Sequence, residues 1–156
     1  MEPWWLESWM PLRQEFSDLP DASEVTRVTV RLAVAVLVGG LVGYEREATG
    51  HAAGLRTHML VALGSAIFVL VPLQAGIPLV DMSRVIQGVV AGIGFLGAGA
   101  IIKMKDNEIK GLTTAASIWL TAAIGVACGL GREATALVSA IFALLVLAAV
   151  RRLVQK

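Results

Sequence analysis

Charged and titratable side chains concentrate around one loop of the sequence. Carboxylates beside guanidinium groups can form ion pairs, and a histidine at a helix end can titrate near neutral pH. We expect either a structural clamp, in which Arg56 pairs with Glu45 or Glu47, or a docking or ligand surface built from the same groups. The members of this charged cluster are Glu45, Arg46, Glu47, Arg56, His58 and Lys103.

A second polar set is a row of hydroxyl side chains farther along the chain. Its spacing of three and four residues is that of one face of a helix. Such hydroxyls can bond backbone carbonyls or neighbouring helices, so the row indicates helix packing or, alternatively, a cation path. The amide of Gln87 is expected to form a hydrogen bond between helices. The row consists of Thr113, Thr114, Ser117 and Thr121.

The sequence shows none of the residue sets typical of an active site. It has no Ser-His-acid set, no paired acids and no histidine or cysteine cluster with ligand spacing. We therefore expect a protein that is not an enzyme, with no catalytic residues and no cofactor. Mg²⁺, which proteins usually hold with carboxylates and waters, stays a candidate ligand without an assigned site.

Five apolar stretches carry these polar residues. The chain is 56% hydrophobic and 16% charged, and a transmembrane helix needs about 20 mostly apolar residues. The sequence therefore predicts an all-α polytopic bundle of five transmembrane helices in a lipid bilayer. The net charge of +1 argues against nucleic acid as a partner. The expected spans are 28–44, 57–73, 85–102, 112–130 and 134–150.

The distribution of Lys and Arg gives the expected orientation. Eight of these residues fall on the side that holds the charged cluster and five on the other side, and the richer side is usually cytoplasmic. We expect residues 1–27 to form a periplasmic or interfacial segment, 28–150 the transmembrane domain and 151–156 a cytoplasmic tail. The N-terminus would then lie outside and the C-terminus inside.

Glycines are frequent in the expected spans, often four residues apart. Such spacing lets helix backbones approach closely in lipid, within one chain or between copies in a homo-oligomer. The expected packing glycines are Gly39, Gly43, Gly88, Gly92, Gly94, Gly97, Gly99, Gly125 and Gly129.

The sequence also repeats itself weakly at a distance of 57 residues. Between residues 54–69 and 111–126, seven of the sixteen aligned pairs are identical. The first two spans and the next two would then form a parallel repeat, as in some membrane carriers. Ala, Gly, Leu and Val produce such matches by composition alone, so chance similarity is the alternative.

Four segments resemble the MgtC/SapB membrane family. They are Gly-Tyr-Glu-Arg-Glu at 43–47, Gly-Leu-Arg-Thr-His-Met-Leu-Val-Ala-Leu-Gly at 54–64, Gly-Ile-Gly-Phe-Leu-Gly-Ala-Gly-Ala-Ile at 92–101 and Gly-Leu-Thr-Thr-Ala-Ala-Ser-Ile-Trp at 111–119. The resemblance covers 28–150. It implies a bacterial inner-membrane protein linked to growth in low magnesium and, in pathogens, to survival inside phagocytes. The sequence ends at Lys156, and by this resemblance we expect a minimal SapB-type member without the ACT-like C-terminal domain of the virulence members.

The resemblance implies two alternative functions. Family members were first regarded as magnesium transporters, and the virulence members are held to restrain the F-type ATP synthase. All twelve acids of this chain lie at the ends of the spans or outside them, whereas ion routes are normally marked by ionisable groups within spans. We therefore expect a regulatory protein that contacts another membrane protein, such as F-type ATP synthase; the alternative is a transporter of Mg²⁺ or another small ion.

Overall fold

The computed structural model describes residues 9–11, 17–18, 21–103 and 108–154. Most of the N-terminal segment that we expect to be periplasmic or interfacial lies outside the described residues. The chain divides into two units, residues 1–30 and 31–156, and each is described by itself.

The first unit contains the start of helix α2, which runs from Ala22 to Ala48. Asp21 precedes it, and the Asp21 carboxylate accepts hydrogen bonds from the Glu24 backbone N–H at 2.8 Å and from the Ser23 hydroxyl at 2.7 Å. One turn farther on, Arg27 pairs with Glu24 at 2.7 Å. An acid before the first turn satisfies N–H groups that have no partner within the helix, so the sequence itself specifies where α2 begins.

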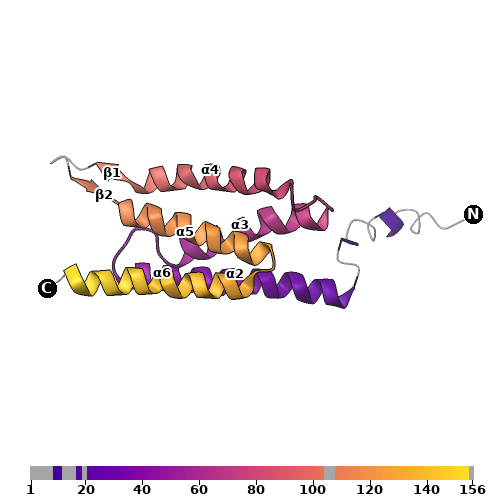
Figure 1. The fold of residues 1–156 in the computed structure, drawn as a ribbon, viewed down its shortest axis with the longest axis horizontal. Helices are drawn as coiled ribbons and strands as arrows, with labels where there is room; N and C mark the ends of the chain where they lie inside the picture. Colours follow the sequence, from indigo (N-terminus) through magenta and orange to yellow (C-terminus); the bar gives the residue numbers. More distant parts are fainter. Residues whose placement is uncertain (1–8, 12–16, 19–20, 104–107, 155–156) are drawn as a thin grey trace, which may run out of the picture. The chain divides into compact units, whose positions relative to one another are not determined.

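The second unit contains the rest of α2 and four further helices (Figure 1). The fold class predicted from the sequence, an all-α polytopic bundle, is confirmed. Pro72 lies inside α3, although we expected the span to end near it; the helix continues for two more residues. The helices are α3 (Leu55–Gln74), α4 (Met82–Ala100), α5 (Leu112–Gly129) and α6 (Glu133–Val154).

Four of the described helices, α2 to α5, are long and apolar enough to cross a membrane. In α6 the apolar stretch is shorter and covers Glu133–Ala148. Only three residues separate α5 from α6, and Gly131 adopts a φ of 73° there. Glycine adopts this left-handed conformation without the steric cost of a Cβ, which allows the tight turn predicted between these helices.

Helix α5 lies at the centre of the packing, because it contacts α3, α4 and α6. One core cluster joins α5 residues Ile124 and Cys128 to small residues of α2, α3 and α6. A second cluster joins Ile118 and Ala122 of α5 to Ile93 of α4 and to α3. Of the residues in the apolar stretch of α5, 50% are buried within the protein, against 6% of those in the apolar stretch of α4. Most of α4 therefore faces outward.

A short β-hairpin joins α4 to α5, where the sequence predicts only a loop. Strands β1 (Ile102–Lys103) and β2 (Ile109–Lys110) pair antiparallel, so α4 ends two residues earlier than the span we expected. Gly111 follows with a φ of 92°, and a Cβ on it would overlap the carbonyl of Ala100. Glycine is required here because the turn is left-handed and the two backbones touch. We call this end of the second unit the β-hairpin end.

The glycines predicted to pack helices fall into two groups. At Gly39 a Cβ would lie 2.7 Å from the carbonyl oxygen of His58, and at Gly43 one would lie 2.8 Å from the Cα of Leu55. A Cβ at Gly125 or Gly129 would overlap a carbonyl of α3, and one at Gly97 would meet Ala115 at 3.7 Å. The remaining four have no described neighbour within 4 Å of a Cβ, so close packing within the described chain is not seen at them and their packing role stays a prediction. They are Gly88, Gly92, Gly94 and Gly99.

Candidate functional site

Five polar side chains are buried at or near the β-hairpin end of the second unit. Three come from the hydroxyl row of α5, one from α3 and one from the last turn of α2. We call them the buried polar cluster. Its members are Arg46, His58, Thr114, Ser117 and Thr121, each at most 5% exposed.

His58 links α3 to α5 within this cluster. Its Nδ1 lies 2.9 Å from the carbonyl oxygen of Gly54, and its Nε2 lies 3.1 Å from the hydroxyl oxygen of Ser117. The same Ser117 hydroxyl lies 2.9 Å from the carbonyl oxygen of Thr114. A continuous chain of hydrogen bonds therefore runs from the start of α3 to the first turns of α5.

The glycine face of α2 makes room for this histidine. A Cβ at Gly43 would lie 3.0 Å from the Cβ of His58, and Gly39 faces the His58 carbonyl. Because glycine lets the two backbones approach so closely, His58 is fully buried although it lies only one turn from the start of α3. The sequence predicted both the glycines and the histidine, but not that the former cover the latter.

Arg46 is 3% exposed, which is unusual for a guanidinium group. Its Nη1 lies 3.4 Å from a carboxylate oxygen of Glu45. Its Nε and Nη2 have no hydrogen-bond partner among the described residues. A buried charge with incomplete pairing is costly, so Arg46 makes this end of the helices strongly polar.

The expected pairing of Arg56 with Glu45 or Glu47 is not found. Glu45 faces Arg46, and the Glu47 carboxylate accepts the backbone N–H of Leu55 at 2.8 Å. Arg56 is exposed and has no ion pair with a described residue. Glu47 thus satisfies a free N–H at the start of α3, where the helix dipole also favours a negative charge.

The other predicted polar residues separate into buried and exposed ones. Thr121 is fully buried, and its hydroxyl has no partner among the described residues. Thr113 and Gln87 are exposed, and Gln87 does not form the predicted hydrogen bond with another described residue. Lys103 lies on β1, and its side chain is outside the described residues.

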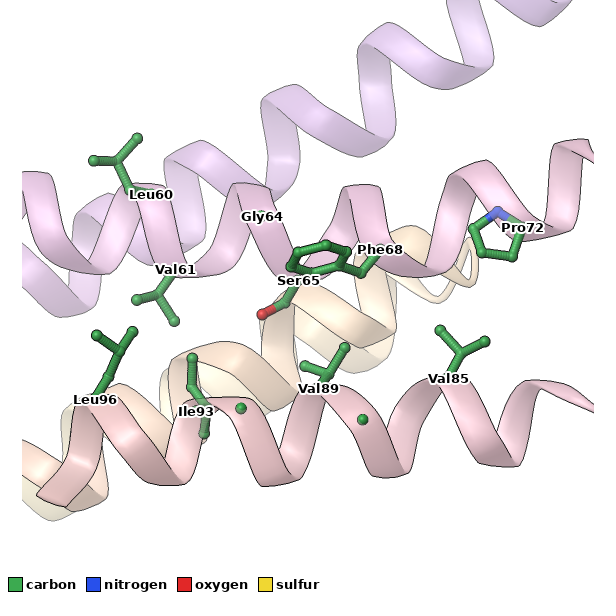
Figure 2. A pocket seen from close by; sticks show the side chains of 12 residues that line it. Leu60, Val61, Gly64, Ser65, Phe68, Pro72, Val85, Val89, Ile93 and Leu96 are labelled. Atoms are coloured by element: carbon green, nitrogen blue, oxygen red, sulfur yellow. The ribbon is translucent and has the colours of Figure 1, made fainter.

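A groove between α3 and α4 is a second candidate site (Figure 2). Its volume is about 730 Å³ and its lining is almost entirely apolar. Gly64 lines one wall, and Gly88 and Gly92 line the other. Figure 2 shows the hydroxyl of Ser65 turned toward the space between the two helices, and this hydroxyl bonds to no described residue.

One residue of these sites, and one at the opposite end of the second unit, were not assigned contacts from the sequence. Ser65 was overlooked because one serine in an apolar helix is common. Arg31, at the end opposite the β-hairpin, has two contacts: its Nη1 donates to the Gly129 carbonyl at 3.2 Å and its Nε lies 3.8 Å from a Glu133 oxygen. A charge inside an apolar stretch normally has a partner, which was the available signal.

Among the described residues, no group of three or more His, Cys, Asp or Glu side chains is placed to hold a metal ion. The polar atoms that do meet are imidazole, hydroxyl and carbonyl groups, with one guanidinium nearby. These groups can donate and accept hydrogen bonds and exchange protons.

Comparison with known proteins identifies the family. The model of the MgtC family matches residues 32–156. This chain belongs to the MgtC family. The match includes every helix of the second unit and therefore both candidate sites. No solved structure was found to match this MgtC-family chain.

Several curated proteins are similar in sequence to this family member. Protein SrpB of Synechococcus elongatus is 44% identical over 138 residues, covering 81% of this chain and 76% of SrpB. Protein MgtC of Brucella abortus is 49% identical, covering 80% of this chain and 51% of that protein. YhiD of Escherichia coli K12, named there as a candidate magnesium transporter, is 42% identical, covering 76% and 58%. The chain thus spans little more than half the length of the latter two.

Proposed function

We propose that this chain is a bacterial inner-membrane protein that supports adaptation to low magnesium by regulating another membrane protein. It binds that protein within the bilayer, through helix faces, and F-type ATP synthase is the candidate partner implied by the family resemblance. The names of the magnesium-related relatives support the physiological context, and the open face of α4 supports the mode of action.

The observation that carries this proposal is the uncovered glycine face of α4. Gly88 and Gly92 line the groove and have no described neighbour within 4 Å of a Cβ. Glycine lowers helix propensity, so glycines are retained in a transmembrane helix mainly where another backbone comes close. Within this chain no described backbone does so, which favours a helix of another molecule.

The groove suits the side chains of a partner helix. Its α3 wall extends from Leu60 to Pro72, about 18 Å along the helix axis. Its apolar lining can hold side chains of a partner, while Ser65 offers one hydroxyl that can donate to a partner carbonyl. Helix association in lipid is driven by close packing and by interhelical hydrogen bonds, and one such hydrogen bond contributes about 0.6 kcal/mol. A second copy of this chain, giving a homo-oligomer, is the alternative occupant.

We further propose that the chain crosses the membrane five times with its N-terminus outside. The β-hairpin end and the C-terminus would then be cytoplasmic, in agreement with the distribution of Lys and Arg. Reporter fusions should be active in the cytoplasm at 47–55 and after 152. Cytoplasmic activity of a fusion at 74–83 would contradict this topology.

The decisive experiment fills the groove without disturbing the fold. Gly92→Leu places a side chain in open space, so the variant should accumulate in the membrane at the wild-type level and keep its melting temperature in detergent. It should nevertheless fail to restore growth of a deletion strain in low magnesium. Ala91→Leu is the matched control, because Ala91 is exposed on the same helix and does not line the groove. A fully active Gly92→Leu protein would contradict the docking proposal.

The same variants distinguish regulation from transport. Photo-crosslinking from position 88 should capture a membrane protein in the wild type, and Gly92→Leu should abolish that product. F-type ATP synthase subunits in the product would identify the partner, whereas a cross-linked dimer would assign the groove to self-association. If purified protein in liposomes instead carries Mg²⁺, and Gly92→Leu does not change that flux, the regulatory proposal is wrong.

A further inference from the structure

The hydrogen-bond chain through His58 contains more contacts than a neutral histidine can supply with hydrogens. Three contacts are made: Nδ1 to the Gly54 carbonyl, Nε2 to the Ser117 hydroxyl, and that hydroxyl to the Thr114 carbonyl. Both carbonyl oxygens can only accept. A neutral imidazole carries one N–H and the serine one O–H, so two hydrogens serve three contacts.

The Gly54 carbonyl decides which hydrogen the neutral ring carries. An oxygen 2.9 Å from Nδ1 requires a hydrogen on Nδ1, which leaves Nε2 as an acceptor. The Ser117 hydroxyl must then donate either to Nε2 or to the Thr114 carbonyl, and the other contact has no hydrogen. The neutral form therefore always leaves one contact unsatisfied.

One additional proton removes this deficit. In the imidazolium form Nδ1–H donates to Gly54, Nε2–H donates to the Ser117 oxygen, and the Ser117 hydroxyl donates to Thr114. All three contacts then hold one hydrogen each. The observed arrangement of acceptors thus matches the charged ring, although a buried cation is costly in itself.

The charged groups around His58 set the conditions for that proton. From α2, the buried Arg46 opposes a second cation, while Glu45 and Glu47 supply negative charge near the same end. Arg56 on α3 is exposed and points away from the core. Helix α5 carries no charged side chain, and its Ser117 hydroxyl contacts His58. The side chain of Lys103 lies outside the described residues.

We propose that His58 is a proton-binding site in the helix core. The proton comes from water at the β-hairpin end, and its arrival fixes the Ser117 hydroxyl on the Thr114 carbonyl; its release turns that hydroxyl toward Nε2. The site lies where α2, α3 and α5 meet, so protonation changes a contact between helices and not a surface group. This proposal does not depend on the docking of a partner at α4.

The test is a ¹⁵N NMR titration of the full chain in lipid nanodiscs. The sequence contains two histidines, so His51→Gln leaves His58 as the single imidazole signal. As the pH falls from about 8 to about 5, the ring should pass from the neutral Nδ1–H tautomer to the doubly protonated form. A ring that keeps one protonation state throughout, or a neutral ring with its hydrogen on Nε2, would overturn the proposal.

Two variants show whether the titration belongs to the core site. Ser117→Ala in the His51→Gln background removes the acceptor of Nε2–H, so at a given pH the ratio of protonated to neutral ring should fall about tenfold. Thr113→Ala, which removes an exposed hydroxyl from the same turn of α5, should leave the ratio unchanged. If Ser117→Ala folds and titrates like Thr113→Ala, His58 acts as an ordinary histidine and the proposal is wrong.

Discussion

The α2–α3 and α4–α5 hairpins begin from similar sequences and are packed very differently. In both hairpins the first helix contacts a glycine just before the second helix, at the β-hairpin end. In the first hairpin Gly43 lies against Gly54, and in the second Ala100 lies against Gly111. Each residue of the second pair is 57 positions after its counterpart in the first. Farther along, α2 presses its glycines onto the α3 backbone, whereas α4 leaves most of its glycines without a described neighbour. The shared contact agrees with the weak internal repeat. We call α2–α3 the closed hairpin and α4–α5 the open hairpin, because most glycines of α4 stay uncovered although α4 also packs against α5.

The covered glycines of α2 serve the buried polar cluster, and the uncovered glycines of α4 leave a surface free. Gly39 and Gly43 bring α2 onto His58, which excludes water from its ring. In the internal repeat, the residue equivalent to His58 is Ala115. An alanine side chain is apolar and small, so it does not need glycines to cover it. Proton exchange is therefore assigned to the polar cluster where α2, α3 and α5 meet, and partner binding to the groove between α3 and α4. Variants of one site should leave the other unchanged.

The largest expected difference between the hairpins follows from adding the same side chain to each. Gly39→Leu would force α2 away from α3, because its Cβ alone would lie 2.7 Å from the His58 carbonyl and 2.8 Å from the Ala62 Cβ. We expect a loss of several kcal/mol, enough to remove most folded protein from the membrane. Immunoblots of membranes and unfolding in detergent measure this effect.

The matched control for Gly39→Leu is Gly94→Leu in α4. Gly94 is exposed, has no described neighbour within 4 Å of a Cβ and does not line the groove. Its replacement should not lower the unfolding free energy by more than about 0.5 kcal/mol, because leucine has the higher helix propensity. Equal damage by both substitutions would show that α4 is packed as tightly as α2.

The sequence predicts the elements well but not which glycines are covered. Gly39 and Gly43 have the same spacing as Gly88 and Gly92, and helical periodicity treats the two pairs alike. Only the position of α3 distinguishes them: it passes directly over the first pair and away from the second. The contrast between a closed and an open hairpin therefore depends on tertiary packing, which a local pattern does not encode.

The polar contacts show a similar limit. His58 and the hydroxyl row are visible in the sequence, and their helical spacing is correct, but the contact between His58 and Ser117 joins residues 59 positions apart. The pairing of Arg56 was wrong for a different reason. A free backbone N–H at the start of α3 competes for the Glu47 carboxylate, and residue charges alone do not reveal that competitor.

A smaller difference concerns the end opposite the β-hairpin. Arg31 joins α2 to the turn between α5 and α6 through the Gly129 carbonyl and Glu133, whereas the residue 57 positions later is Gly88. Arg31→Ala should lower the unfolding free energy by about 1 kcal/mol, because both contacts are partly exposed. Glu133→Gln should cost less than half of that, since it leaves the bond to Gly129 intact.

A double-mutant cycle apportions the Arg31 contacts. If Arg31→Ala and Glu133→Gln have equal and non-additive effects, the hydrogen bond to Gly129 contributes nothing and the ion pair alone acts. Arg84→Ala is the control, because Arg84 is exposed and its side chain has no described partner.

The smallest expected effect lies at the first turns of α2 and α4, which both follow an aspartate. The Asp21 carboxylate accepts the Glu24 N–H, whereas the Asp81 side chain forms no capping hydrogen bond. Asp21→Ala should therefore speed amide hydrogen exchange at Glu24 severalfold. Asp81→Ala should not change exchange at Arg84, whose N–H bonds to the Asp81 backbone oxygen at 3.2 Å.

The start of α2 should also depend on pH. The hydrogen bonds from the Glu24 N–H and the Ser23 hydroxyl lower the pKa of Asp21 below its usual value. A lowered pKa means that the carboxylate stabilises the helix start above the usual aspartate pKa, and that this effect is lost as the pH falls through the lowered value. The amide shift of Glu24 should follow that titration by NMR, whereas the Arg84 amide, whose helix start has no side-chain capping bond, should not show this dependence. Equal responses at the two helix starts would mean that Asp21 does not cap α2 in the membrane-embedded protein.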